Sequence, residues 1–160
     1  MIARGLALAV VVALLDQASK LWILGLMLPR QPGQQIIELL PFFNLVLVWN
    51  RGVSFGLFNN PDSPWNALAL TLVAAAIVGG LVVWLRRATH GLIVFAIGLV
   101  IGGAIGNVVD RLRFGAVVDF LDVHAGAWHW PAFNVADSAI CIGVALMLID
   151  SLLVRRELRT

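Results

Sequence analysis

The sequence predicts an all-α polytopic membrane protein, with four transmembrane helices and a small extracytoplasmic β-hairpin or sheet region. Composition is the first reason, because 61% of the 160 residues are hydrophobic and only 12% are charged, whereas a soluble domain is roughly half apolar and about 25% charged. So few charges cannot cover such an apolar chain, and the apolar excess must face lipid. The second reason is that the chain contains four long apolar runs. A water-soluble globule is therefore excluded, and the length allows one domain.

The four runs lie at about residues 5–28, 65–85, 91–110 and 134–154. At about 1.5 Å per residue, each helix would be long enough to cross roughly 30 Å of hydrocarbon. The first run follows Arg4 as a secretion signal would, but it continues through charged residues without a convincing cleavage site, so we expect it to be retained. The second carries no charge, and it follows Ser63 and Pro64, which are typical of a helix N-cap and first position.

The charge pattern predicts the orientation. An even number of spans places both chain ends on one side of the membrane, and the side richer in Lys and Arg is cytoplasmic. Six arginines lie at the ends of the chain or in the loop between the second and third spans, and four lie on the other side: Arg4, Arg86, Arg87, Arg155, Arg156 and Arg159 against Arg30, Arg51, Arg111 and Arg113. We expect cytoplasmic termini and outer segments at residues 29–63 and 111–133. The net charge of +2 gives no indication of nucleic-acid binding.

The first outer segment is expected to hold a β-hairpin. Residues 43–49 are rich in Val, Leu and Phe, Asn50-Arg51-Gly52 is a turn signal, and residues 53–58 would form the second strand. Two strands alone are marginally stable, so they should rest on the span ends or on the lipid surface.

Charged and small residues inside the spans are the next candidates, because ionisable groups are costly in a membrane. Asp16 and Lys20 are four residues apart on one helix face and can form an ion pair. The neighbouring Ser19 and Lys20 suggest a serine–lysine peptidase, but adjacent helical residues point about 100° apart and do not face each other. The spacing of Gly102 and Gly106 favours close helix packing.

A pair of aspartates is the strongest candidate for catalysis. Asn107 and Asp110 are three residues apart, as are Asn134 and Asp137, so each pair shares a helix face near the outer end of a span. If the chain between them is extended, Asp119 lies on an apolar face that would raise the pKa of its carboxyl group. Two close carboxylates that share a proton can activate water. Asp119 with Asp137 is the preferred pair and Asp110 the substitute, while a purely structural polar cluster remains the alternative.

Other reactive side chains give weaker signals. His124 and His129 are possible metal ligands, but no acidic or sulfur ligand has the spacing to complete a tetrahedral site. The single Cys141 lies in an apolar run without an activating base, so it is assigned to packing.

Five ordered motifs resemble those of the bacterial lipoprotein signal peptidases, also called signal peptidase II. They are Asp16-Gln17-Ala18-Ser19-Lys20, Asn50-x-Gly52, the run from Gly102 to Asn107 followed by Asp110-Arg111, Val117-Val118-Asp119-Phe120, and Phe133-Asn134-x-Ala136-Asp137. The resemblance covers nearly the whole chain. The hairpin departs from it at Arg51 and Val53, where many members have Thr and Ala.

The resemblance implies a membrane-embedded aspartic endopeptidase domain over residues 1–160. Such an enzyme removes the signal peptide from diacylglyceryl-modified prolipoproteins, on the N-terminal side of the lipid-modified cysteine. It implies a catalytic dyad of Asp119 and Asp137, and positions that support the dyad or bind substrate at Asp16, Lys20, Asn50, Gly52, Asn107, Asp110, Arg111, Asn134 and Ala136. It also implies a monomer in contact with lipid in the bacterial inner membrane, an active site near the outer face that binds the inhibitor globomycin, and no metal or organic cofactor.

Two other classes stay open on the residues alone, a small proton-coupled transporter and a non-catalytic assembly factor. Asp16 and Lys20 favour transport, because intramembrane charges often line proton relays. The acidic residues cluster at the outer end, however, with only Asp150 near the inner side, which favours a site over a conduit. An assembly factor would tolerate neutralisation of Asp119 and Asp137, whereas a peptidase would not.

Overall fold

The computed structural model describes residues 1–31, 34–52 and 65–157 of the chain. Within these residues four long helices carry the fold: α1 (Ile2–Met27), α2 (Trp65–Arg87), α3 (Gly91–Phe114) and α4 (Val135–Glu157). Each contains a stretch long and apolar enough to cross a membrane, which confirms the four predicted spans. The third helix is longer than predicted. It continues past Asp110 and ends at Phe114, where Gly115 adopts a left-handed conformation (φ 68°) that only glycine adopts without strain.

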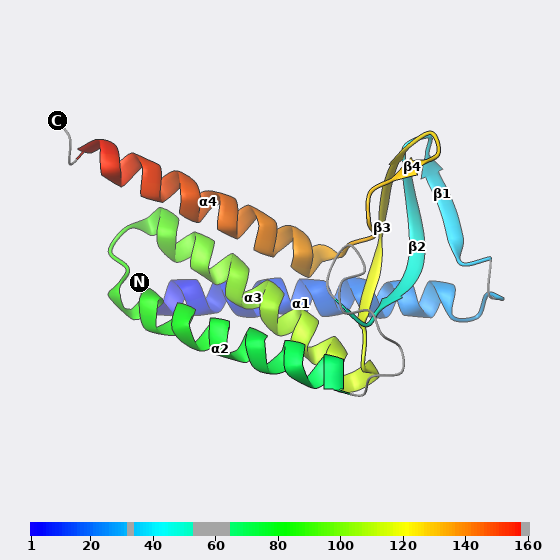
Figure 1. Ribbon diagram of the computed structural model, residues 1–160, viewed down its shortest axis with the longest axis horizontal. Coiled ribbons are helices and arrows are strands. Elements are labelled where there is room, and N and C mark those ends of the chain that lie inside the picture. The colour runs from blue at the N-terminus through cyan, green and yellow to red at the C-terminus, as the bar shows by residue number, and fades with distance from the viewer. Residues whose placement is uncertain (32–33, 53–64, 158–160) are drawn as a thin grey trace.

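Helix α3 is the centre of the bundle and packs against the other three helices (Figure 1). Of its most apolar stretch 61% is buried, against 6% for α2, which therefore lies at the periphery. Glycines allow the close approach. A Cβ atom at Gly102 would lie 2.6 Å from the Ala9 carbonyl oxygen of α1, and one at Gly103 would overlap the Ala136 carbonyl oxygen of α4. The predicted packing role of this glycine-rich run is confirmed.

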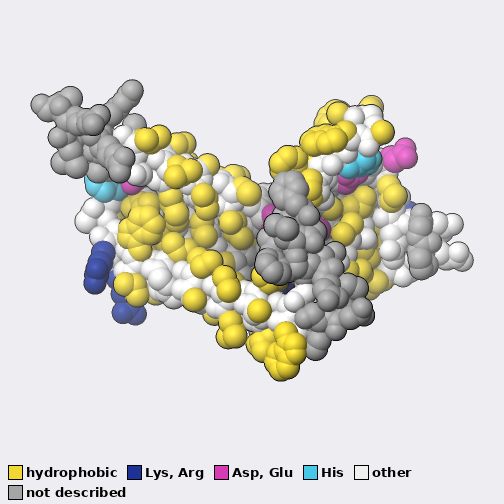
Figure 2. Space-filling view, viewed as in Figure 1, with side chains coloured by type: hydrophobic (Ala, Val, Ile, Leu, Met, Phe, Trp, Pro, Cys, Tyr) yellow, Lys and Arg dark blue, Asp and Glu magenta, His cyan; other side chains and the backbone are white. Residues whose placement is uncertain are grey.

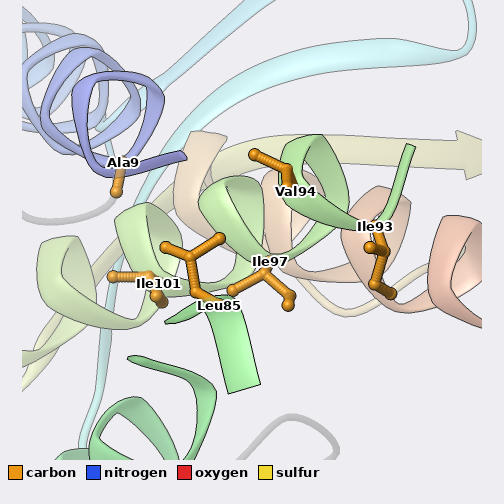
Figure 3. Close-up of a cluster of buried hydrophobic side chains, with 6 residues drawn as sticks. All are labelled: Ala9, Leu85, Ile93, Val94, Ile97 and Ile101. Atoms are coloured by element: carbon orange, nitrogen blue, oxygen red, sulfur yellow. The ribbon is translucent and has the colours of Figure 1, made fainter. Parts of the chain in front are cut away.

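A cluster of apolar side chains joins α1, α2 and α3. Figure 3 shows its six buried members on the three helices: Ala9, Leu85, Ile93, Val94, Ile97 and Ile101. Because lipid tails are as apolar as these side chains, the cluster stabilises the bundle through close packing and not through transfer out of water.

A four-stranded antiparallel sheet stands at one end of the bundle. Its strands are β1 (Ile36–Leu40), β2 (Phe43–Asn50), β3 (Val117–Ala125) and β4 (Trp128–His129), in the order β1-β2-β3-β4. The strand predicted at residues 43–49 is confirmed, but its hairpin partner is β1 and its other neighbour is β3. The predicted second strand at residues 53–58 and the predicted helix cap at Ser63 and Pro64 lie outside the described residues.

The sheet rests on the end of a span, as expected for so small a sheet. Ile23 and Met27 of α1 form a buried cluster with Leu45 of β2 and Phe120 of β3. Figure 1 shows the start of α1, the end of α4 and the α2–α3 connection at the opposite end of the helices. Figure 2 shows apolar side chains over the helical surface and Lys and Arg side chains gathered at that opposite end. The protein is thus a multi-pass membrane protein with its sheet at one end of the spans.

Candidate active site

Asp119 lies on β3, five residues beyond the end of α3, and its side chain is 2% exposed. Two amides hold its carboxylate. Asn50 at the end of β2 donates its Nδ2 to Oδ2 at 2.9 Å, and Asn134 donates its Nδ2 to Oδ1 at 2.7 Å. The Asn50 amide is itself oriented, because its Oδ1 accepts the backbone N–H of Gly52 at 3.0 Å. Each oxygen of Asp119 therefore has a fixed donor.

Asp137 lies in the first turn of α4, and a reciprocal cap holds it there. Asn134 accepts the Asp137 backbone N–H at 2.9 Å, while the Asp137 carboxylate accepts the Asn134 backbone N–H at 3.3 Å. This is the geometry of a capping box, and the helix N-terminus favours a negative charge at this position. Asn107 of α3 donates its Nδ2 to the other Asp137 oxygen at 2.8 Å.

Asn134 links the two aspartates. Its side chain is fully buried, its Oδ1 caps α4 above Asp137, and its Nδ2 holds Asp119. The predicted convergence of these motifs near the end of the spans is what the structure shows. Figure 2 shows the surface hollowed between the helices and the sheet, with acidic side chains visible at the base.

The environment raises the pKa of Asp119 to about 7, mainly because burial disfavours its charged form and also because the charge of Asp137 repels it. The hydrogen bonds from Asn50 and Asn134 and the charge of Lys20 oppose this shift. The direction agrees with the alternation argument. Asp122 of the same strand is also buried, at 6% exposed. The two carboxylates differ in their partners and not in their burial.

Lys20 is the centre of a second polar network beneath the pair. Its Nζ lies 2.8 Å from Asp16 Oδ2 and 2.9 Å from Asp110 Oδ2, and it donates to Asn107 Oδ1 at 3.0 Å. The predicted Asp16–Lys20 ion pair is confirmed. Three acceptors match the three protons of the ammonium group, so this buried charge is fully satisfied.

Each carboxylate of this network also holds the backbone next to a candidate catalytic residue. Asp110 accepts the N–H of Val118 at 3.0 Å, one residue before Asp119. Asp16 accepts the N–H of Ala136 at 2.9 Å, one residue before Asp137. Because Lys20 joins the two carboxylates, one buried charge cluster sets the relative position of β3 and α4.

Asp110, the substitute candidate, has both oxygens engaged. Oδ1 accepts Gln17 Nε2 at 2.9 Å, and Oδ2 receives Lys20 and Val118. Gln17 also donates to the Gly106 carbonyl oxygen at 3.1 Å, a role that the sequence analysis missed because it named Gln17 only as part of a motif. The signal was present, since an amide in an apolar span also needs partners.

Arg111 lies in the last turn of α3, inside the helix and not in the outer segment as predicted. Its guanidinium donates to the carbonyl oxygens of Asn107 and Gly52, each at 3.5 Å, and it interacts electrostatically with Asp137 and Asp119. It therefore places a positive charge beside the pair and connects α3 to the end of β2.

Two weaker sequence interpretations are resolved. Ser19 donates its hydroxyl to the Asp16 carbonyl oxygen of its own helix at 2.7 Å, while Lys20 is held by carboxylates, so the serine–lysine arrangement is absent here. Cys141 is exposed on α4 and is not packed between helices, because its side of the helix faces outward from the bundle.

No acidic ligand was expected to complete a tetrahedral site with the two histidines, and the structure brings one carboxylate, that of Asp122, to them as a third ligand. Asp122 Oδ1 lies 2.9 Å from His129 Nδ1, and Asp122 Oδ2 lies 3.7 Å from His124 Nδ1. The turn at Gly126 (φ 61°) brings His129 opposite His124, a non-local pairing that linear spacing does not reveal.

The chain is similar over most of its length to one family of bacterial enzymes. The profile described as signal peptidase (SPase) II matches residues 8–153. A lipoprotein signal peptidase of Caulobacter vibrioides is 50% identical over 148 residues, which cover 92% of this chain and 85% of that protein. Another, from Methylobacterium sp. (strain 4-46), is 46% identical over 149 residues, 92% of this chain and 87% of that protein. A solved structure described as a bacterial membrane enzyme, determined by the in meso method at 1.9 Å resolution, superposes with a TM-score of 0.79 at 29% identity and covers 95% of this chain and 94% of that one.

Proposed function

Because the chain belongs to the signal peptidase II family, we propose that it is an aspartic endopeptidase of the bacterial inner membrane. Its substrates are diacylglyceryl-modified prolipoproteins, which it cuts on the N-terminal side of the lipid-modified cysteine. The observation that carries this proposal is the pair formed by the buried Asp119 and the half-buried Asp137, joined through Asn134 where the sheet meets the spans.

The proposed mechanism assigns different protonation states to the two aspartates. Asp119 holds a proton near neutral pH, because its pKa is raised to about 7, and it donates a hydrogen bond to the scissile carbonyl oxygen. Asp137, at the N-terminus of α4, acts as the general base and removes a proton from water. The water oxygen then bonds to the carbonyl carbon. When the C–N bond breaks, the nitrogen takes the proton that Asp137 removed from water, which leaves a carboxylate on the signal peptide and an amine on the cysteine.

The surrounding residues position this pair. Asp16 and Asp110 fix the backbone before each aspartate, and the ammonium group of Lys20 orients both of these carboxylates. Asn107 orients Asp137 by a hydrogen bond. The positive charge of Arg111 stabilises the state in which Asp119 and Asp137 together carry one negative charge.

The depth of the pair suits a substrate anchored by lipid. Asp137 lies in the first turn of α4 and Asp119 just beyond the end of α3, so both belong at a membrane boundary, where a lipid-modified cysteine would present its scissile bond. We place this boundary at the extracytoplasmic face and the termini in the cytoplasm, because Arg86 and Arg87 lie at the other end of the spans. We further propose that the enzyme acts as a monomer and that globomycin binds at the aspartate pair.

The test is a gel-shift cleavage assay on the purified protein in detergent. The substrate is a prolipoprotein with or without its diacylglyceryl group, and a known member of the family serves as the positive control. We expect cleavage of the lipid-modified form, with a product whose mass begins at the modified cysteine. Failure on a substrate that the control cleaves in the same detergent would contradict the proposal.

A further inference from the structure

A second cluster of polar side chains lies on the sheet, at the end of β3 away from the aspartate pair. Asp122 and His124 of β3 and His129 of β4 bring one ligand atom each to within 4.8 Å of one another. We propose that these three residues bind a divalent transition-metal ion, with Zn²⁺ as the best fit. This inference does not depend on the proposed peptidase activity.

The distances suit tetrahedral zinc. With bonds of about 2.0–2.1 Å, two ligand atoms of a tetrahedral site lie about 3.4 Å apart. The separations from one carboxylate oxygen, Asp122 Oδ2, are 3.0 Å to His129 Nδ1 and 3.7 Å to His124 Nδ1, which lie on either side of that value. The two imidazole rings are stacked, with centroids 4.8 Å apart and planes at 16°, so both present Nδ1 to the same carboxylate. Two imidazoles and one carboxylate form a donor set that zinc accepts readily.

Unsatisfied polar atoms point to a missing partner at this place. Among the described residues, two buried side-chain atoms lack a hydrogen-bond partner: Nδ1 of His124, a member of this cluster, and Oδ1 of Asn44, whose amide contacts Asp122. Buried polar atoms without partners are rare and costly. A metal ion would take up the lone pair of His124 Nδ1, and a water completing the coordination would donate to Asn44 Oδ1.

Asn44 also supports the carboxylate ligand. It lies opposite Asp122 on β2, is 8% exposed, and donates its Nδ2 to Asp122 Oδ2 at 3.0 Å. Such a hydrogen bond orients a ligating carboxylate and raises metal affinity.

An ion can reach the cluster from outside. A cavity of about 560 Å³ is lined by Asn44, Asp122 and His129, and the side chain of His129 is 51% exposed. A site with an entry path does not require the sheet to unfold before it binds metal. The bound ion would tie the short β3–β4 turn to the body of the sheet.

The test is a zinc titration of the full-length protein in detergent, without a histidine tag and after removal of metal with a chelator. Competition with a chromophoric chelator gives stoichiometry and affinity, and Co²⁺ serves as a coloured probe of tetrahedral geometry. We expect one ion per chain, tetrahedral Co²⁺ absorption, and a rise in the midpoint of thermal unfolding on addition of Zn²⁺.

Histidine variants identify the ligands. His124→Ala and His129→Ala should each weaken binding at least about tenfold and abolish the thermal shift. His90→Ala, which removes an exposed histidine at the α2–α3 connection, is the matched control and should bind like the wild type. Far-UV circular dichroism and prolipoprotein cleavage in the presence of chelator report whether the variants keep the fold.

The wild type alone can overturn the proposal. Absence of binding, or Co²⁺ bound without tetrahedral absorption, would refute it whatever the variants do. Wild-type affinity in the His124→Ala/His129→Ala double variant would refute it as well, because the ion would then be held elsewhere.

Discussion

Replacing Asp119 by Asn should stabilise the folded protein above about pH 7 and destabilise it near pH 4. Folding raises the pKa of Asp119 from 3.8 to about 7, so the protonated form is favoured in the folded state. As the pH rises from about 4 to 7, the unfolded chain ionises first, and the folded state loses about 4 kcal/mol relative to it at about 1.4 kcal/mol per pKa unit. Asn carries no charge and avoids this loss.

The substitution also has a cost, which sets the net effect. Asn50 and Asn134 both donate to the Asp119 carboxylate. An amide has one acceptor oxygen, so its NH₂ group would face the second donor, at a cost of about 1–3 kcal/mol. The variant should therefore be about 1–3 kcal/mol more stable than the wild type above pH 7, and less stable by a similar amount near pH 4.

The assay is thermal unfolding of both proteins in detergent across this pH range. Asp150→Asn is the control, since it removes a carboxylate near the far end of α4, and its stability difference from the wild type should not change sign with pH. If the difference between Asp119→Asn and the wild type is the same at both ends of the range, folding does not raise the pKa of Asp119, and the assignment of the proton to this residue is wrong.

Three further predictions follow from the packing and the hydrogen bonds. Lys20→Met leaves two carboxylates buried without their cation and should destabilise the protein by about 3–5 kcal/mol. If the free energy of unfolding of this variant in detergent lies within about 1 kcal/mol of the wild-type value, the ion pairs of Lys20 are not structural. Gly102→Ala places a Cβ atom 2.6 Å from a backbone oxygen of α1 and should lower the free energy of unfolding by about 1–3 kcal/mol. In the control Gly79→Ala the Cβ atom meets open space, so this variant should not be destabilised. Equal thermal stability of the two variants would contradict the close approach of α1 and α3. The rate of cleavage should decline as the pH rises through about 7, where Asp119 loses its proton. Asn50→Ala removes a hydrogen bond that lowers the pKa of Asp119, so it should move this decline to a pH about one unit higher. A pH–rate profile in which the decline does not move would contradict the role of Asn50.

The helices could be predicted from the sequence because the signals that specify them are local. A membrane span requires a long apolar run, and close helix approach requires small residues at helical spacing. The end of α3 was misplaced by four residues, because Asp110 and Arg111 are charged yet lie inside the helix. Lys20 and the backbone of β3 satisfy that aspartate, and neither partner is visible from the local sequence.

The sheet was predicted only in part, because strand pairing is non-local. Strand β2 is visible in its run of Val, Leu and Phe, but β1 has five residues and becomes a strand only by pairing with β2. The alternation of β3 correctly predicted that the pKa of Asp119 is raised, but not that the amides of Asn50 and Asn134 hold its carboxylate. It could not indicate the burial of Asp122, which depends on Asn44 from β2 and His129 from β4.

The central claim is that Asp119 and Asp137 act together on the scissile bond. The most direct measurement is the rate of prolipoprotein cleavage by Asp119→Asn, Asp137→Asn and the control Asp150→Asn, each shown to be folded by its thermal unfolding transition. General acid–base groups contribute about 10²–10⁴-fold each, so both dyad variants should lose at least about a hundredfold in rate while the control retains wild-type activity. A folded Asp119→Asn or Asp137→Asn variant that cleaves at close to the wild-type rate would contradict the claim and return Asp110 to consideration.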